Sequence, residues 1–176
     1  MKRSVSFWSF LGFVFVSVAG TLLHFLYDWL GQSTLAGVFS AVNESIWEHM
    51  KLLFVPLMVF AVIESRFLMD TQDNFWCVKL LSTLVGLLAI PMLYYTYTGA
   101  LGVSADWFNI TIFFIATALV FWLEARMLRD GFACRLPTAA AKAVLVGIGA
   151  LFVLFTFLPP HVPLFRDPLD GTYGIQ

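Results

Sequence analysis

The chain has 176 residues, of which 60% are hydrophobic and only 12% are charged, and its formal net charge at pH 7 is −1. A soluble domain carries about 25% charged residues, so this chain has too few polar side chains to cover a surface that faces water. The composition therefore excludes an ordinary soluble globular protein and a disordered chain. Because no basic excess exists to meet phosphates, it also excludes a nucleic-acid binder, and an integral membrane protein remains.

Five stretches are long and apolar enough to cross a bilayer as helices, because a hydrocarbon core about 30 Å thick needs roughly 20 apolar residues. They cover residues 7–30, 47–69, 76–98, 107–128 and 139–158. Pro56 and Pro91 lie inside two of them, where neighbouring helices can satisfy the freed carbonyl, so we expect kinks and not breaks. The sequence thus predicts an all-α polytopic membrane protein that forms one integral membrane domain over residues 1–176.

Lysine and arginine are distributed unevenly between the two sides of these spans. With the N-terminus in the cytoplasm, eight of the ten basic residues fall on the inner side, and only Lys51 and Arg166 fall on the outer side. This excess favours a cytoplasmic N-terminus and an extracytoplasmic C-terminus. Cys77 and Cys134 then lie near the inner face, where thiols stay reduced, although a disulfide between them remains open.

Two acidic residues stand at equivalent positions near the inner ends of the second and fourth spans. Glu64 lies in Val-Ile-Glu-Ser-Arg and Glu124 in Trp-Leu-Glu-Ala-Arg. A duplicated helical hairpin would produce this echo, and so would two helices that each need a charged inner end, which is the plainer interpretation. We expect both carboxylates to be solvated among the arginines and to contribute little to stability.

The first group of polar residues on the outer side is His24 and Asp28, near the end of the first span. A spacing of four places both side chains on one face of a helix. An ionisable side chain at this depth is costly and indicates a functional site that faces the bundle interior. The alternative is that Asp28 orients His24 for packing, or that both lie in the wet interface.

The second group lies in Asn-Glu-Ser-Ile-Trp-Glu-His-Met-Lys, residues 43–51. Apolar residues at helical spacing before it predict an amphipathic helix over about 34–51, which either lies in the outer interface or runs straight into the second span. Glu44 and Glu48 share a face of this helix, and with His49 they could ligate a metal or act as acid and base. Alternatively, Glu44 serves a helix start capped by Asn43, and Glu48 pairs with the lysine three residues later.

The third group is the tail, residues 159–176, which holds four of the seven prolines. Its prolines forbid a regular helix, and its spaced apolar residues predict a cap folded back on the outer mouth, where His161, Arg166 and Asp167 could complete a site. An ordered tail with no role in a site is the alternative. Tyr94 and Tyr97 end the third span, either as part of an interfacial aromatic belt or as hydrogen-bond donors into the site.

The histidine–aspartate pair, the motif of residues 43–51 and the C-terminal Phe-Arg-Asp-Pro…Gly-Thr-Tyr-Gly together resemble a family of bacterial multi-pass membrane proteins catalogued as a domain of unknown function. The resemblance spans nearly the whole chain and implies a bacterial inner-membrane protein, but it supplies no site. In site chemistry alone, the histidines and acids are similar to membrane zinc hydrolases of the ceramidase and progestin-receptor type. The helix count and the order of the ligands differ from that type.

These patterns favour a metal-dependent membrane hydrolase or transferase that acts on lipid or lipid-linked substrates at the outer face. Zinc or another divalent metal would be held by His24, Asp28, His49 and His161. Glu48 would act as the general base, with Glu44 as a second catalytic carboxylate. The residues expected to bind substrate are Asn43, Tyr94, Tyr97, Arg166 and Asp167.

Three other functions use the same residues. A small proton- or ion-coupled transporter or binding module would relay charge through the intramembrane acids and histidines. Haem ligation by His24 and His49 is disfavoured, because no Cys-x-x-Cys-His motif occurs. A structural accessory subunit would use the polar groups for packing alone. No phosphate-binding or dinucleotide-binding glycine motif occurs, so no nucleotide cofactor is expected; the expected partners are membrane lipids and further copies of the chain.

Overall fold

The computed structural model describes residues 2–69 and 72–175, and helices joined by loops are its regular elements. Five long helices, a short helix and one 3-10 turn follow one another in this part of the chain: α1 (Lys2–Trp29), α2 (Thr34–Phe39), α3 (Ile46–Leu68), α4 (Phe75–Leu101), α5 (Asp106–Arg129), α6 (Thr138–Phe157) and η2 (Pro163–Phe165). The five long helices are apolar and long enough to cross a membrane, as the sequence predicts. Helices α3 and α4 continue through Pro56 and Pro91 without a break.

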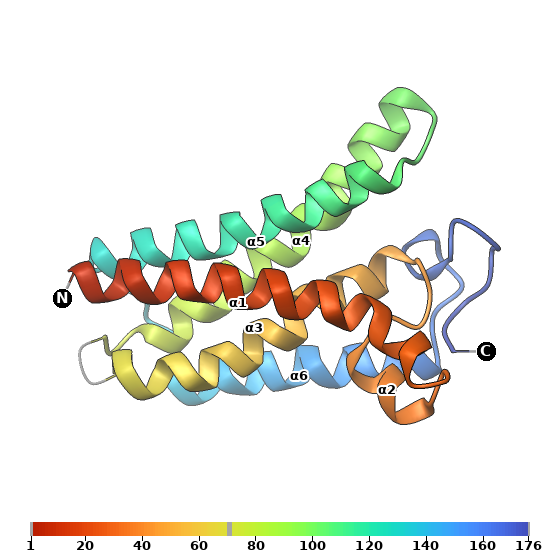
Figure 1. Ribbon diagram of the computed structural model, residues 1–176. Helices are drawn as coiled ribbons and strands as arrows, with labels where there is room; N and C mark the ends of the chain where they lie inside the picture. Colours follow the sequence, from red (N-terminus) through yellow and green to blue (C-terminus); the bar gives the residue numbers. More distant parts are fainter. Residues whose placement is uncertain (1, 70–71, 176) are drawn as a thin grey trace.

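Helix α3 is the central element of the bundle. It packs against α1, α4, α5 and α6, and 61% of its span is buried, against 28% for α1 and 22% for α6. Figure 1 shows the two chain ends at opposite ends of the bundle, and the paired helices α4 and α5 diverging from the rest toward the end that carries the C-terminus. The divergence leaves room beside α1 and α3 at that end.

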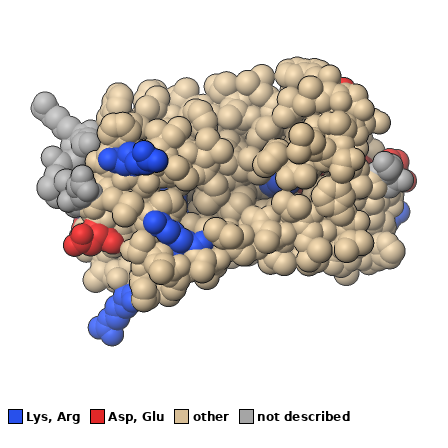
Figure 2. All heavy atoms as spheres, turned by 90° about the horizontal axis from the view of Figure 1, so that it is seen from below, with Lys and Arg blue, Asp and Glu red and all other residues tan. Residues whose placement is uncertain are grey.

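The outer surface of the bundle is apolar along most of its length. Large side chains such as Phe10, Met92 and Val146 are 68%, 69% and 72% exposed, which in water would be unfavourable. Figure 2 shows a face on which most of the visible charged groups gather at the end that carries the N-terminus, with a wide uncharged band beside them. Such a band matches the hydrocarbon core of a bilayer.

The amphipathic helix predicted over residues 34–51 is wrong, because the chain leaves helical geometry between α2 and α3. Ser40 ends α2, and the Ser45 hydroxyl accepts a hydrogen bond from the backbone N–H of Glu48 at the start of α3. Between them the Asn43 side chain accepts from the N–H of Ser45 at 3.0 Å. Serine and asparagine side chains compete with the helix for backbone partners, which favours caps and turns here.

One further expectation is corrected at the end of the bundle that carries the N-terminus, and one alternative left open by the sequence finds its geometry there. Cys77 in the first turn of α4 and Cys134 in the loop before α6 lie at disulfide distance, with Cα atoms 6.2 Å apart. Glu64 and Glu124 are fully buried, not solvated, and both pair with Lys79 of α4. Each residue lies on a helix face that points into the bundle, where an unpaired charge would be costly.

Candidate metal centre

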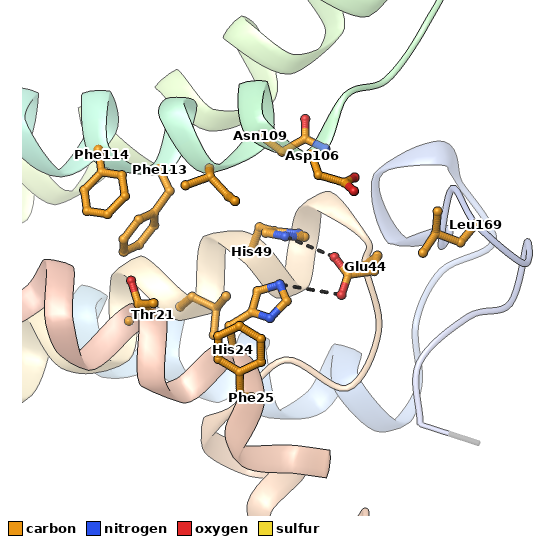
Figure 3. Close-up of a pocket in the computed structure, with 13 residues that line it drawn as sticks. Thr21, His24, Phe25, Glu44, His49, Asp106, Asn109, Phe113, Phe114 and Leu169 are labelled. Atoms are coloured by element: carbon orange, nitrogen blue, oxygen red, sulfur yellow. Dashed lines mark ion pairs between the residues drawn. The ribbon is translucent and has the colours of Figure 1, made fainter. Parts of the chain in front are cut away.

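Three side chains that can ligate a metal meet at the end of the bundle near the C-terminal tail. His24 lies in α1, Glu44 in the loop before α3, and His49 in the first turn of α3. The Nε2 atom of His24 is 3.5 Å from one carboxylate oxygen of Glu44, and Nε2 of His49 is 3.4 Å from the other. One ligand atom from each residue can be chosen so that all three lie within 4.8 Å of one another. Figure 3 shows both imidazoles turned toward the carboxylate.

The ring of His49 is oriented by its second nitrogen. Its Nδ1 atom lies 2.9 Å from the carbonyl oxygen of Ser45, and because a carbonyl can only accept, Nδ1 carries the proton. Whenever the ring is neutral, it therefore presents the lone pair of Nε2 toward Glu44. A histidine whose other nitrogen donates to a backbone carbonyl is the usual arrangement of a metal ligand.

The ring of His24 lies close to that of His49, with centroids 5.5 Å apart. Its Nε2 faces Glu44, while Nδ1 is buried and has no hydrogen-bond partner in the part of the chain that the structure describes. A buried polar atom without a partner is unfavourable in a stable structural pair. The arrangement therefore indicates a site whose polar groups are placed for a ligand.

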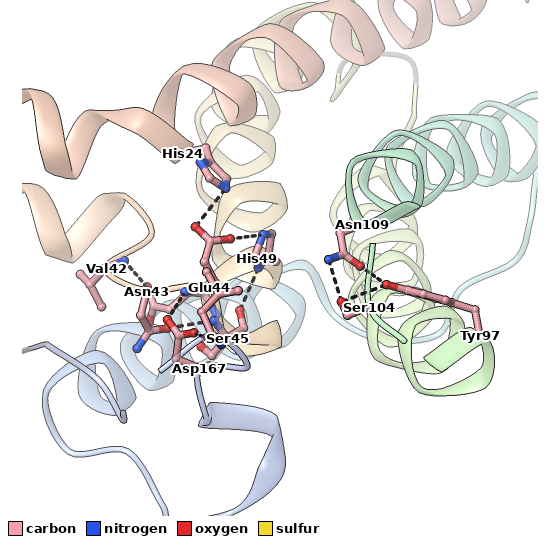
Figure 4. A network of polar contacts seen from close by, with 12 residues as sticks. His24, Val42, Asn43, Glu44, Ser45, His49, Tyr97, Ser104, Asn109 and Asp167 are labelled. Atoms are coloured by element: carbon pink, nitrogen blue, oxygen red, sulfur yellow. Dashed lines mark hydrogen bonds and ion pairs between the residues drawn. The ribbon is translucent and has the colours of Figure 1, made fainter. Parts of the chain in front are cut away.

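The loop that carries Glu44 is fixed by the tail. The backbone N–H of Glu44 donates to Asp167 Oδ2 at 2.8 Å, and Asn43 Nδ2 donates to the carbonyl of Gly174 at 3.1 Å. Gly174 has φ of +64°, and a Cβ there would lie 2.7 Å from a backbone oxygen of α6, so glycine is required. Figure 4 shows this network around Asn43, Glu44 and Asp167. Asn43 and Asp167, which the sequence analysis predicts to bind substrate, thus hold in place the loop that carries Glu44.

The electrostatics of the cluster favour an ionised carboxylate. The pKa of the Glu44 carboxyl is lowered from its ordinary value, chiefly by a hydrogen bond from His24, and positive charge on His49 and His24 acts in the same direction. Partial burial opposes these effects but does not outweigh them. Glu44 is therefore available as a charged ligand throughout the physiological pH range.

A cavity of about 400 Å³ adjoins the cluster. Its walls come from α1, α3, α5 and the tail, and Figure 3 shows the cluster at one side of it. The lining is mostly apolar, and its polar side chains are those of the cluster, of Thr21 on α1 and of the start of α5. It consists of Gly20, Thr21, His24, Phe25, Glu44, His49, Leu52, Asp106, Asn109, Ile110, Phe113, Phe114 and Leu169. An apolar hollow with a few convergent polar groups is the usual form of a small-molecule site.

The polar wall opposite the cluster is Asp106 and Asn109 in the first turn of α5. Tyr97 donates its hydroxyl hydrogen to Asn109 Oδ1 at 2.5 Å, and Asn109 Nδ2 donates to Ser104 Oγ at 3.3 Å. These contacts, drawn in Figure 4, fix which end of the Asn109 amide donates. Tyr97 therefore positions Asn109, and Tyr94 lines a smaller hollow shared with Asn109 and Glu44.

Glu48 lies apart from the metal cluster, in a separate buried pair. Its carboxylate meets Lys51 Nζ at 2.5 Å, and both side chains are essentially inaccessible to solvent. Lys51 also donates to the carbonyl of Gly37 at 2.8 Å and to Thr156 Oγ1 at 2.9 Å. The pair joins α2, α3 and α6. It matches the alternative given in the sequence analysis, in which Glu48 pairs with Lys51 and does not belong to the site.

The other predicted site residues lie outside the cluster. Asp28 is exposed, and its carboxylate oxygen lies 3.5 Å from Gln32 Nε2. His161 packs against the ring of Tyr173, with centroids 4.7 Å apart, and Arg166 pairs its backbone with the same tyrosine. The tail folds back on the loop of Glu44 through Asp167 and lines the cavity with Leu169, while its last residue lies outside the described chain.

Sequence reasoning did not assign Asp106 or Asn109 to the site. Asn109 opens a glycosylation-type triplet inside a predicted span, and that pattern has no bearing on the cavity. The available signal was their spacing of three, which places both on one face of the first turn of α5.

A single protein-family model covers both the helical bundle and the tail. Residues 1–175 match the model of the family of unknown function DUF6512. The chain belongs to DUF6512. Neither a search of curated proteins nor a search of solved structures finds a significant match. The DUF6512 match includes the tail that holds Glu44 in place, so the candidate centre lies entirely within the family unit.

Proposed function

We propose that this DUF6512 protein is a metal-dependent hydrolase or transferase that acts on lipid or lipid-linked substrates. The observation that carries the proposal is the convergence of His24, Glu44 and His49 beside an apolar cavity of about 400 Å³ in a membrane-spanning bundle.

Two histidines and one glutamate are a ligand set of catalytic zinc sites, which leave the remaining position for water or substrate. Zinc ligands at about 2.1 Å in a tetrahedron lie about 3.4 Å apart. The His24 nitrogen lies 3.5 Å from one Glu44 oxygen and the His49 nitrogen 3.4 Å from the other. One ligand atom from each residue lies within 4.8 Å of the others, so a tetrahedral set requires a small closure of the three side chains. When bound, zinc lowers the pKa of a water ligand to about 7 and polarises a carbonyl group.

The groups that face the cluster supply the remaining chemistry. Asp106 is the acidic residue of the opposite wall and can accept a proton from an attacking water or hydroxyl group. Asn109, held by Tyr97, directs its amide nitrogen as a donor. A donor fixed in this way can bind the carbonyl oxygen of an ester or amide and stabilise the charge that develops on it.

The apolar part of the cavity indicates the substrate class. Phe25, Ile110 and Phe114 line it and are also 47%, 58% and 38% exposed on the outside of the bundle. In a bilayer these side chains face the acyl chains, so a lipid can enter sideways and keep its tail in an apolar environment. The described lining contains no lysine or arginine, so the headgroup would be held by the metal and by hydrogen bonds.

The excess of basic residues near the N-terminal end supports a cytoplasmic N-terminus. For the membrane we propose the bacterial inner membrane. The cavity and the cluster then open toward the outer leaflet. Glu48 is assigned no catalytic role in this proposal, because Lys51 occupies its carboxylate.

Metal content measured by plasma mass spectrometry tests the proposal, on detergent-purified protein never exposed to chelator. We expect close to one equivalent of metal in the wild type and a large loss in His24→Ala and His49→Ala. His161→Ala is the matched control, since His161 packs on Tyr173 outside the cluster, and it should keep the metal. A wild type without metal, or equal content in all three variants, would reject the metal centre.

Lipid turnover is measured separately, by mass spectrometry of a bacterial lipid extract incubated with the protein. We expect products that require both the metal and Asp106. Metal loading without any turnover would leave the centre intact and reject the enzymatic role.

A further inference from the structure

A second buried polar cluster lies at the opposite end of the bundle from the metal centre. It consists of Glu64 on α3, Lys79 on α4 and Glu124 on α5, all with 0% of their surface exposed. Glu64 follows His49 by fifteen residues on the same helix, which is about 22 Å along its axis. The two clusters are therefore separate sites, and the role of the second is independent of the proposed enzymatic function.

The lysine lies between the two carboxylates. Lys79 Nζ is 2.6 Å from Glu64 Oε2 and 2.5 Å from Glu124 Oε1. The rings of Phe75 and Phe121 cover the ammonium group at 5.3 Å and 5.5 Å. The cluster is thus enclosed by apolar groups and excludes bulk water.

No other charged group of the described chain compensates the cluster. Arg66 on α3, Arg126 and Arg129 on α5, and Lys142 on α6 lie on exposed faces. The buried Glu48 and Lys51, at the other end of α3, pair with each other. Lys142 is directed instead over the ring of Trp76, at 4.8 Å. Two ionised carboxylates and one ammonium would therefore leave one uncompensated negative charge in a membrane-buried site, which is strongly unfavourable.

The hydrogen bonds of the cluster are incomplete in a way that a proton would correct. Glu64 Oε2 accepts a hydrogen bond from Lys79, and Glu124 Oε1 is in ion-pair contact with the same ammonium, but Glu64 Oε1 and Glu124 Oε2 have no partner within the described residues. The two carboxyl groups are also close enough to interact directly with each other. A proton on Glu124 would give it a donor toward an unpartnered oxygen of Glu64, so that charge and hydrogen bonding are satisfied together.

We propose that Glu64, Lys79 and Glu124 form a proton-binding site, in which Glu124 carries a proton at neutral pH while Glu64 and Lys79 are ionised. Lys79 contacts both carboxylates, and we assign the proton to Glu124 because the contact of Lys79 with Glu64 has hydrogen-bond geometry while its contact with Glu124 is an ion pair. Binding adds one O–H bond to the Glu124 carboxylate and removes one negative charge. A metal cation is disfavoured as the ligand, because the Lys79 ammonium already occupies the space between the carboxylates.

The two similar sequence segments at the ends of the second and fourth spans supply the two acids of this site. Glu64 and Glu124 are the acids of the two similar segments, and each is followed after two residues by an exposed arginine, Arg66 or Arg126. The two helices thus bring equivalent acids to one lysine and carry basic groups to the aqueous surface beside it. The proton site therefore lies near the water-facing end of the bundle, from which it can be loaded.

Infrared spectroscopy tests the proposal by counting protonated carboxyl groups in the purified protein at neutral pH. The number of protonated carboxyl groups should equal the number of acids in the cluster minus the number of lysines in it. We expect one protonated carboxyl in the wild type that shifts in deuterated water, none in Glu124→Gln, and two in Lys79→Met. Asp130→Asn, which removes an exposed acid at the end of α5, is the control and should leave the band unchanged.

Glu124→Gln copies the size and neutrality of the protonated acid, so it should keep a thermal midpoint close to that of the wild type. It therefore keeps the test decisive even if Lys79→Met does not fold. The absence of the band in the wild type, or a band that persists undiminished in Glu124→Gln, would overturn the proposal. A band that appears only after sodium is removed would assign the site to a cation and would overturn it as well.

Discussion

The carboxylate of Asp167 accepts a hydrogen bond from the backbone N–H of Glu44 at 2.8 Å, across 123 residues of sequence. The same carboxylate accepts a hydrogen bond from the N–H of Leu169 at 2.7 Å. One side chain therefore fixes both the turn of the tail and the loop of Glu44. Asp167 is only 5% exposed, and this shields the contact from water. The tail therefore determines where the one acidic ligand of the candidate metal centre lies.

Replacing Asp167 by asparagine should weaken metal binding without touching a ligand. An amide offers one acceptor oxygen where the carboxylate offers two, so either Glu44 or Leu169 loses its partner. Loss of a group that orients a ligand typically costs 10–100-fold in metal affinity, and we expect an effect of that order in competition titrations with a zinc indicator. Asp170→Asn is the matched control, because Asp170 is exposed and bonds only within its own turn to Thr172. Equal affinities of the two variants would contradict the role given to Asp167.

The buried pair of Glu48 and Lys51 should be important for stability and not for catalysis. Lys51→Met leaves a buried carboxylate without its partner, and breaking such a pair costs about 3–5 kcal/mol. The double variant Lys51→Met with Glu48→Gln removes the charge as well and should recover much of that loss. Thermal unfolding in detergent measures the stability of the single and the double variant. A Lys51→Met protein as stable as the wild type would show that the pair contributes little.

The membrane topology was readable from the sequence because hydropathy reports directly on the span, and the five apolar stretches coincide with the five long helices. The convergence of His24, Glu44 and His49 was only partly readable. The residue types and their location at one end of the bundle were evident from the sequence. The break between Ser40 and Ser45, which turns Glu44 toward α1, depends on contacts with a tail far along the chain. Periodicity alone placed Glu44 beside Glu48 on one helix face.

The buried cluster was missed for a related reason. Glu64 and Glu124 lie near arginines in the sequence, and local spacing favoured solvated pairs. Their true partner, Lys79, belongs to another helix and faces both acids only after α3, α4 and α5 pack. Which face of an apolar helix points inward is decided by its neighbours, and the nearly uniform hydropathy of α4 and α5 carries little information about it.

Acidification should release metal through the histidines before it affects Glu44. Because the folded-state pKa of Glu44 is lowered, its ionised form stabilises the protein above its ordinary pKa, and that contribution is lost only as the pH falls through the lowered value. Protons compete with the metal for the two imidazole ligands, so metal release measured against pH should begin above the range in which the Glu44 carboxyl titrates. Release confined to the range in which carboxylates titrate would contradict this order.

The cysteine pair reports on the orientation of the bundle. The 6.2 Å between the Cα atoms of Cys77 and Cys134 lies within the range that a disulfide spans. If this end faces the cytoplasm, as the basic residues favour, both should be free thiols in growing cells and should close when the purified protein is oxidised. Trapping thiols in intact cells before lysis, followed by a gel-shift with a maleimide polymer, measures the state in each case. Asp170→Cys in a Cys77→Ser, Cys134→Ser background should in contrast react with a membrane-impermeant reagent added outside, since Asp170 is exposed on the tail at the other end. A pair that is already oxidised in cells, with Asp170→Cys protected from the outside reagent, would reverse the orientation and place the metal centre on the cytoplasmic side.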